Sequence, residues 1–237
     1  ADRFLHCIAV SMKPPDPSKI STYSSESQTT LEFCALLGEE IPLEVLAAMG
    51  VKPESLDCLF DDGWICEGSS PHLANVLVDA DAVRESIPWS RRRQICTALA
   101  SALAEQGEVS HRLGRLWMCA QRFDDARAVF VSTARTCCEN GDFSTALMCC
   151  ADALDGWPRD RNPADRKDLL HLAIRCARNC SDVPRLREFL KEVLNMVEDS
   201  LEKSELYAQL GDAARQQADR VNAVAYLKEA AAAAEQG

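Results

Sequence analysis

The residues best suited to acid–base or nucleophilic chemistry are four histidines, His6, His72, His111 and His171. None stands at a motif spacing from a serine or cysteine nucleophile, and the chain contains no GxSxG, HExxH or Rossmann glycine pattern. His111 falls in an amphipathic helical segment, where a solvated side chain is a simpler interpretation than catalysis. Scattered catalytic residues would need a pocket of perturbed ionisable groups, which no pattern indicates. The sequence therefore predicts a protein that is not an enzyme.

Twelve cysteines could bind a metal or form disulfides, but their setting argues against both. Cys96, Cys119 and Cys149 lie in amphipathic helical segments, where cysteine behaves as a small core residue. There is no CxxC and no Cys/His quartet with zinc-finger spacing. Cys176 and Cys180 are four residues apart, yet a metal site there would lack two further ligands. We expect reduced structural cysteines, no metal, no cofactor and a cytoplasmic location.

The basic triplet Arg91–Arg93 is the place where phosphate binding could be sought. No GxxxxGK[ST] loop occurs, so nucleotide binding through a P-loop is not expected. Residues 1–88 hold five Lys and Arg against fifteen Asp and Glu, a net charge of −10 out of −11 for the chain. The triplet more simply offsets Asp79, Asp81 and Glu85, and the acidic first part disfavours nucleic-acid binding.

Long apolar runs and leader sequences would place the chain in or across a membrane. The longest apolar stretches are interrupted by charges within a few residues, so no membrane association is predicted. The N-terminus has an apolar patch without a basic start or a cleavage pattern, and we expect no signal peptide. The chain begins at Ala1 instead of Met, which suggests a piece of a longer protein.

The elements that would hold any site begin with a polar segment and a small mixed module. Residues 1–28 are predicted to be a linker that is partly ordered. Three short apolar helices follow, the first from about residue 29, and each ends at a glycine. Two short strands then surround the Gly-Ser-Ser-Pro turn at 68–71. Three helices and a hairpin are the element order of a winged helix, so residues 29–88 are predicted to form a winged-helix-like module.

From Pro88 onward the sequence shows one amphipathic helix after another. Helices are predicted at 89–106, 110–121, 124–139, 143–155, 163–179, 184–197, 202–217 and 220–235. Their separators are short and polar, which forces neighbouring helices to run antiparallel. We therefore predict a mostly all-α fold, in which residues 89–237 form an αα-hairpin superhelix after the winged-helix-like module.

One pattern occurs twice in these helices, about a hundred residues apart. Its positions are Leu113, Gly114, Trp117, Ala126 and Phe130 in the first copy, and Leu210, Gly211, Ala214, Ala223 and Leu227 in the second. We expect the glycine to let a second helix approach closely and the alanine to be the contact point on that helix. The Phe or Leu would be the knob that packs back. Segments between the two copies match more loosely.

This pattern resembles the tetratricopeptide repeat, a helix-turn-helix unit with small residues at its eighth and twentieth positions. The resemblance implies a concave face lined by the first helix of each repeat, where a protein or peptide partner, or a small effector, would lie. Repeat offsets alone suggest six partner-binding residues: His111, Arg115, Met118, Arg178, Asp212 and Arg215.

The first part and the junction are similar to the region after the nucleotide-binding module of STAND-type signal-transduction ATPases and MalT-like regulators. The matching features are His72-Leu73, Val76-Leu77-Val78, Ile87-Pro88, Arg91-Arg92-Arg93 and Leu99-Ala100. This similarity implies the sensor and scaffold part of a larger ATPase or regulator, with the ATPase module upstream. That module would be an alternative partner, and occupancy of the repeats would shift packing against it.

The competing class is a DNA-binding transcriptional regulator that uses the winged helix. The third helix of such a module should carry positive charge where it reads DNA. Here the corresponding segment, PESLDCLFDDG, has four acids and no base. Nucleic acid is therefore not the expected partner, and non-catalytic protein–protein interaction is the predicted function.

Overall fold

The computed structural model describes residues 20, 22–38, 40–76, 80–158 and 161–236. The chain divides into two compact units. Unit one comprises the residues up to 108 together with 115–122, and unit two comprises 109–114 and the residues from 123 onward. Helix α6 (His111–Cys119) therefore begins in unit two and ends in unit one.

Unit one contains a winged-helix-like arrangement of three helices and three short strands. The elements follow as α1 (Ser25–Leu37), β1 (Ile41–Pro42), α2 (Leu43–Ala48), α3 (Pro53–Asp61), β2 (Ile65–Glu67) and β3 (Leu73–Val76). The strands form an antiparallel sheet in the order β1-β3-β2, with Ile41 opposite Ala74 and Ile65 opposite Val76. The hairpin of β2 and β3 confirms the predicted strands. Strand β1 was not predicted, because a strand of two residues is too short to show an alternation of apolar and polar side chains.

Helix α1 begins at Ser25, earlier than the predicted start at about residue 29. The cause is an N-terminal cap, because the Ser24 hydroxyl accepts a hydrogen bond from the backbone N–H of Ser27 at 3.1 Å. The apolar face alone marks the later start, since the first turn of the helix is polar. The cap therefore sets the helix boundary.

The core of unit one includes a polar chain of three side chains around Trp64, which is 1% exposed. Trp64 Nε1 donates a hydrogen bond to the Tyr23 hydroxyl at 2.8 Å, and that hydroxyl donates to Asp62 Oδ2 at 2.7 Å. Burial and the hydrogen bond to Asp62 raise the pKa of Tyr23 to about 12. The phenol therefore stays protonated and serves as a structural link.

Helices α4 (Ala80–Ser86) and α5 (Trp89–Glu105) complete unit one with the second half of α6. The basic triplet at the start of α5 holds this helix in place. Arg91 Nε donates to Glu32 Oε2 at 2.7 Å, and Arg93 Nε donates to the Ala120 carbonyl at 3.2 Å. The sequence did not indicate Glu32 as a neighbour of the triplet. Asp79, Leu77 and Val78, which the sequence interpretation used, lie outside the described residues.

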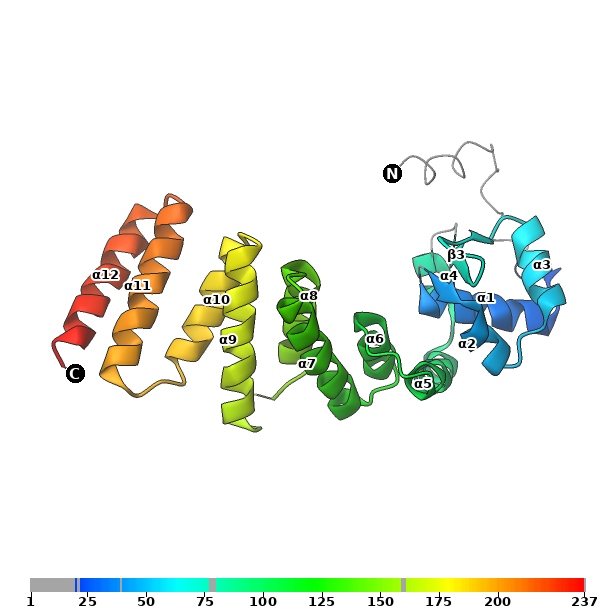
Figure 1. Cartoon of the computed structure of the whole chain (residues 1–237), viewed down its shortest axis with the longest axis horizontal. Helices are drawn as coiled ribbons and strands as arrows, with labels where there is room; N and C mark the ends of the chain where they lie inside the picture. The colour runs from blue at the N-terminus through cyan, green and yellow to red at the C-terminus, as the bar shows by residue number, and fades with distance from the viewer. Residues whose placement is uncertain (1–19, 21, 39, 77–79, 159–160, 237) are drawn as a thin grey trace. The chain divides into compact units, whose positions relative to one another are not determined.

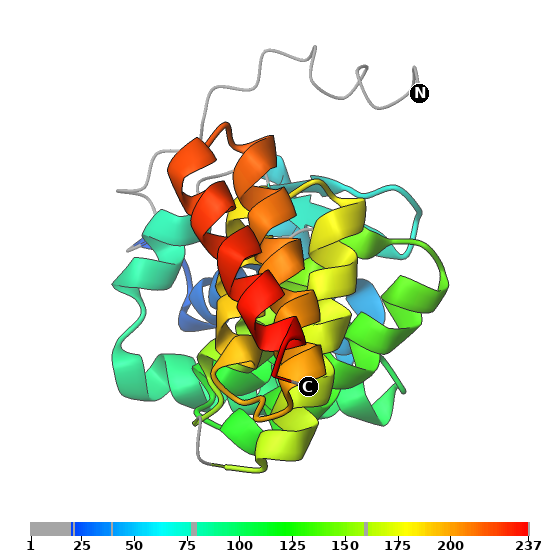
Figure 2. The ribbon, with the colours of Figure 1, turned by 90° about the vertical axis from the view of Figure 1, so that its left-hand side faces the viewer.

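Unit two is a stack of helical hairpins that follow one another in chain order (Figure 1). The hairpins are α7 (Phe123–Glu139) with α8 (Phe143–Asp155), α9 (Pro163–Asn179) with α10 (Val183–Leu194), and α11 (Ser200–Gln216) with α12 (Arg220–Ala234). Consecutive helices pack on each other as in tetratricopeptide repeats, and Figure 2 shows α11 and α12 side by side. The predicted fold class, mostly α-helical with αα-hairpins, is confirmed.

One turn geometry recurs inside these hairpins. A residue with left-handed backbone is followed by an aspartate whose side chain accepts an N–H in the first turn of the next helix. The pairs are Gly141 (φ 80°) with Asp142, Ser181 (φ 57°) with Asp182, and Ala218 (φ 57°) with Asp219. These three-residue connections keep the two helices of each hairpin close and antiparallel.

A buried arginine joins three helices of unit two. Arg166 in α9 is 4% exposed. Its Nη1 donates hydrogen bonds to the carbonyl oxygens of Leu154 and Trp157 at 3.0 and 2.7 Å, and its Nε donates to Glu192 Oε1 at 2.6 Å. These bonds satisfy carbonyl groups at the end of α8 and pair the buried charge with α10.

Candidate functional site

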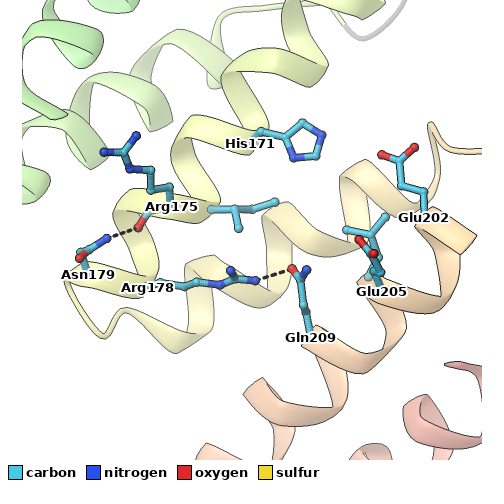
Figure 3. Close-up of a pocket in the computed structure, with 9 residues that line it drawn as sticks. His171, Arg175, Arg178, Asn179, Glu202, Glu205 and Gln209 are labelled. Atoms are coloured by element: carbon cyan, nitrogen blue, oxygen red, sulfur yellow. Dashed lines mark hydrogen bonds between the residues drawn. The ribbon is translucent and has the colours of Figure 1, made fainter. Parts of the chain in front are cut away.

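Unit two has a groove between α9 and α11, the first helices of two successive hairpins. Its first section has a volume of about 450 Å³ and is drawn in Figure 3. The lining side chains are His171, Ile174, Arg175, Arg178 and Asn179 from α9, and Glu202, Glu205, Leu206 and Gln209 from α11. Ile174 and Leu206 are the apolar side chains of this lining, and both are largely buried.

A second section of about 490 Å³ continues the groove to the turn between α9 and α10, at Ser181. The two sections share Arg178 and Gln209. Arg178 Nη2 donates a hydrogen bond to Gln209 Oε1, so a side-chain bridge joins α9 to α11 where the sections meet (Figure 3). A ligand long enough to occupy both sections would contact or displace this bridge.

The two walls of the groove carry opposite charge. The α9 wall presents Arg175 and Arg178, and the α11 wall presents Glu202, Glu205 and Asp212. At one end Lys167 Nζ pairs with Glu202 Oε1 at 2.8 Å. Among the residues that the structure describes, no ion pair joins Arg175 or Glu205 to another side chain. Their charges are therefore available to a ligand that carries the opposite charges.

Three of the six partner-binding residues suggested by the sequence lie on α9 and α11. Arg178 and Asp212 line the groove. Arg215 follows Asp212 on α11, and its Nη2 lies 3.7 Å from Asp212 Oδ1. Repeat offsets thus lead to the same two helices that form the groove.

The other three suggested residues lie on α6. His111 Nε2 is 2.7 Å from Asp152 Oδ2 on α8, and the His111 ring is 5.5 Å from the Phe130 ring. Arg115 is exposed and Met118 is half-buried, both on the part of α6 that belongs to unit one. Helix α6 packs on α7 through the contact of Gly114 with the Phe130 ring, as α11 packs on α12 through Gly211 and Leu227. None of these three residues lines the groove between α9 and α11, and their contact with a partner stays a prediction.

The repeated pattern marks positions of close helix contact. Nine of its ten members are buried, namely Leu113, Gly114, Trp117, Ala126, Phe130, Leu210, Gly211, Ala214 and Ala223. Leu227 packs against Gly211 but is 41% exposed, because it lies on an open side of α12 with Val221 and Val224. The first copy spans α6 and α7, and Phe130 on α7 lies against Gly114 on α6.

Several groove residues were not singled out from the sequence, although a signal for them exists. On α9, His171, Arg175 and Arg178 are spaced by four and three residues, and on α11 the same holds in reverse order for 202, 205 and 209. Side chains at these spacings share one face of a helix. The loose match of this region to the repeat pattern left that face unassigned.

Metal and membrane sites were also sought in the part of the chain that the structure describes; His6 lies outside it. No three His, Cys, Asp or Glu side chains gather there in a way that could hold a metal ion. Burial raises the pKa of the Cys34 and Cys149 thiols to about 12, so these thiols stay protonated and pack as apolar groups. Within the same described ranges, no helix is both long and apolar enough to cross a membrane.

Comparison with known proteins finds no matching family model and no matching curated protein. Among solved structures, the chain is similar to BtubC (BKLC) from P. vanneervenii, with 13% identity and a TM-score of 0.39 over 67% of this chain and 70% of that one. It is also similar to MamA MSR-1 C2, with 14% identity and a TM-score of 0.37 over 66% of this chain and 90% of that one. Scores at this level carry no argument about function, and the repeat architecture rests on the helix packing of unit two itself.

Proposed function

We propose that this chain is a non-catalytic interaction scaffold whose groove between α9 and α11 binds an extended polypeptide segment of a partner protein. The observation that carries the proposal is the pair of oppositely charged walls facing one groove. A segment with an acidic side chain toward Arg175 and a basic side chain toward Glu205 would complement both walls. Such charge complementarity fixes the register and orientation of a bound segment.

The lining of the groove favours a peptide over a small metabolite. Small-molecule sites are mostly apolar and enclose most of the ligand. Here charged side chains from both helices border the groove, and two sections follow one another along the helices. An extended chain can place side chains in both sections and exchange the Arg178–Gln209 bond for hydrogen bonds of its own.

In its finer form, the proposal makes the chain the sensor part of a STAND-type ATPase or a MalT-like regulator. The order of a winged-helix-like module, the short helix α4, an Arg-rich start of α5 and a series of hairpins supports this context. The partner segment would then include the ATPase module of the same protein. The coding sequence upstream of Ala1 tests this form: a P-loop there supports it, and a start codon near Ala1 contradicts it.

The groove is tested by selecting a random peptide display library on the purified chain and measuring the recovered peptides by fluorescence anisotropy. Arg175→Glu and Arg178→Glu each reverse one charge of the α9 wall. We expect each to weaken binding of the recovered acidic peptides about tenfold, which corresponds to about 1.4 kcal/mol. Arg135→Glu is the matched control, because Arg135 is an exposed arginine on α7 that does not line the groove.

Charge reversal in the peptide completes the design. A peptide whose acidic residue is replaced by lysine should bind Arg178→Glu better than the wild type. Peptides that bind both groove variants and the wild type equally would place the interaction surface outside the groove and contradict the proposal.

A further inference from the structure

The outer face of α12, the last helix of unit two, is a stripe of exposed residues that no other described part of the chain covers. Its members recur at spacings of three and four residues, which place them on one side of a helix. They are Arg220, Val221, Val224, Leu227, Lys228, Ala231 and Glu235. Val221 and Val224 are 82% and 54% exposed, and Leu227 is 41% exposed. Figure 2 looks onto this end of unit two, with α12 in front.

The equivalent side of α8 is buried. Both helices start directly after a capping aspartate, Asp142 for α8 and Asp219 for α12, so equivalent positions can be counted from it. The fifth, eighth and twelfth residues after Asp142 are at most 6% exposed, namely Leu147, Cys150 and Leu154. Helix α9 of the next hairpin packs on α8. The same count from Asp219 gives exposed residues, namely Val224, Leu227 and Ala231. The outer face of α12 therefore corresponds to a side that is covered elsewhere in the stack.

Opposite charges stand at the two ends of the outer face. Arg220 is the first residue of α12, and Glu235 directly follows its last residue with helical backbone, at φ −73° and ψ −18°. Both are exposed, and among the residues that the structure describes neither takes part in an ion pair. Two outer faces that run antiparallel would bring Arg220 of each copy to Glu235 of the other. The face is therefore complementary in charge to a second copy of itself.

A two-fold axis between positions 227 and 228 produces this pairing. Arg220 and Glu235 lie equally far from that point, about 11 Å along the helix at a rise of 1.5 Å per residue. Around the helix they lie about 60° apart, on opposite sides of the stripe, since a turn takes 3.6 residues. A two-fold axis exchanges the sides of the stripe as well as its ends, so each charge meets its opposite. The same axis places Val224 opposite Ala231 of the partner copy.

The centre of the pairing is apolar as well. Leu227 comes to lie beside Lys228 of the partner copy, whose methylene stem can cover the leucine while its ammonium group stays in water. The two Lys228 side chains lie on opposite sides of the axis, so they do not face each other. The contact between two copies thus consists of covered apolar side chains with an ion pair at each end.

We propose that the chain forms a two-fold symmetric dimer in which the outer faces of two α12 helices pack antiparallel. This proposal goes beyond the peptide-binding function and does not depend on it, because no residue of α12 lines the groove between α9 and α11. A two-fold contact uses the same surface on both copies and closes on itself, so association stops at two. The face is much smaller than a standard interface of about 20–30 residues a side, and we expect a dissociation constant on the order of 10–100 μM.

Sedimentation velocity of the purified chain measures the association. We expect the weight-average mass to rise from that of one chain toward that of two between about 5 and 500 μM. Arg220→Glu and Glu235→Arg each place like charges at both ends of the contact, and each should weaken the dimer about tenfold. Both changes favour the helix itself, because acidic residues stabilise a helix start and basic residues a helix end. A weaker dimer in these variants is therefore not a consequence of unfolding.

The double variant Arg220→Glu, Glu235→Arg exchanges the two charges and should restore association to near the wild-type level. Glu229→Arg is the matched control, since Glu229 is exposed on α12 but points away from the outer face, and this variant should associate like the wild type. Val224→Glu places a charge in the apolar centre and should weaken the dimer about tenfold.

Circular dichroism shows that each variant is folded before its association is compared. A chain that stays monomeric at about 500 μM would overturn the proposal and leave the outer face to a helix of another protein. A dimer that Arg220→Glu and Val224→Glu do not weaken, or a double variant as weak as the single ones, would place the contact elsewhere and overturn it equally.

Discussion

A Cβ atom added to Gly114 would lie 2.3 Å from Cε1 of Phe130, so the aromatic ring occupies the space that any side chain at Gly114 would need. Phe130 is 1% exposed, and the His111 ring lies 5.5 Å from it. In the second copy of the pattern, the same atom on Gly211 would lie 2.9 Å from Cγ of Leu227, which is 41% exposed. The same sequence pattern therefore produces a contact with a buried ring at Gly114 and a contact with a partly exposed side chain at Gly211.

Alanine at these two glycines is predicted to have different effects. In a helix interior, Gly→Ala normally stabilises by about 1 kcal/mol. At Gly114 the ring of Phe130 cannot move aside, and we expect overpacking to leave a net loss of about 1–2 kcal/mol. At Gly211 the Leu227 side chain can rotate toward solvent, so Gly211→Ala should stay within about 1 kcal/mol of the wild type. Urea unfolding followed by circular dichroism measures both changes.

A second substitution tests whether the Phe130 ring causes the predicted loss of stability in Gly114→Ala. Phe130→Leu removes the ring, so adding it to Gly114→Ala should cost less stability than adding it to the wild type. Simple additivity of the two changes would mean that the Gly114 contact is not the source of the loss.

Arg166 is predicted to be the most sensitive charged residue of unit two. Arg166→Met would remove the side-chain donor of the Leu154 and Trp157 carbonyl oxygens, of which Leu154 keeps a backbone donor, and would leave Glu192 without its charge partner. Removing one partner of a buried pair costs about 3–5 kcal/mol. Glu192→Gln keeps an acceptor for Arg166 and should cost clearly less. Thermal unfolding of both variants measures the difference, and equal losses would show that the ion pair dominates over the carbonyl bonds.

The helices of unit two could be predicted from sequence because their signals are local. Apolar periodicity and turn aspartates such as Asp142 and Asp219 lie within a few residues of the boundaries that they set. The hydrogen bonds by which Arg166 joins three helices could not be predicted, because in the sequence Arg166 is one more arginine at a polar helix start. The same holds for the bond between Tyr23 and Trp64, which depends on two residues 41 apart.

The groove could be predicted in part. Repeat offsets led to Arg178 and Asp212, because they indicate which face of a first helix points to the next repeat. The same offsets also suggested His111, which lies 2.7 Å from Asp152 on α8 and does not line the groove. Helix phase along a stack depends on how all hairpins pair, and a pattern within one pair of helices does not contain that information.

The turn aspartates predict a specific loss of stability in acid. The hydrogen bonds with Thr145 and Asn222 lower the pKa values of Asp142 and Asp219 in the folded chain. A lowered folded pKa adds stability above the unfolded value of about 3.9, and this stability is lost as the pH falls through the folded pKa. Asn caps a helix as well as Asp but does not titrate. The double variant Asp142→Asn, Asp219→Asn should therefore lose less thermal stability than the wild type between about pH 5 and pH 2, and parallel losses would contradict this account.

The winged-helix-like module is predicted not to bind DNA. Its third helix, α3, carries Glu54, Asp57 and Asp61 and no basic residue. The basic residues nearby are already paired, since Lys52 contacts Glu26 at 3.1 Å and Arg91 contacts Glu32 at 2.7 Å. A protein that neutralises phosphates binds DNA more tightly as salt is lowered. We therefore expect the anisotropy of a labelled duplex to stay unchanged when the chain is added at low salt, with a basic winged-helix protein as the positive control. Binding that weakens with salt, and that is lost when Lys52 is changed to Glu, would instead support the DNA-binding regulator.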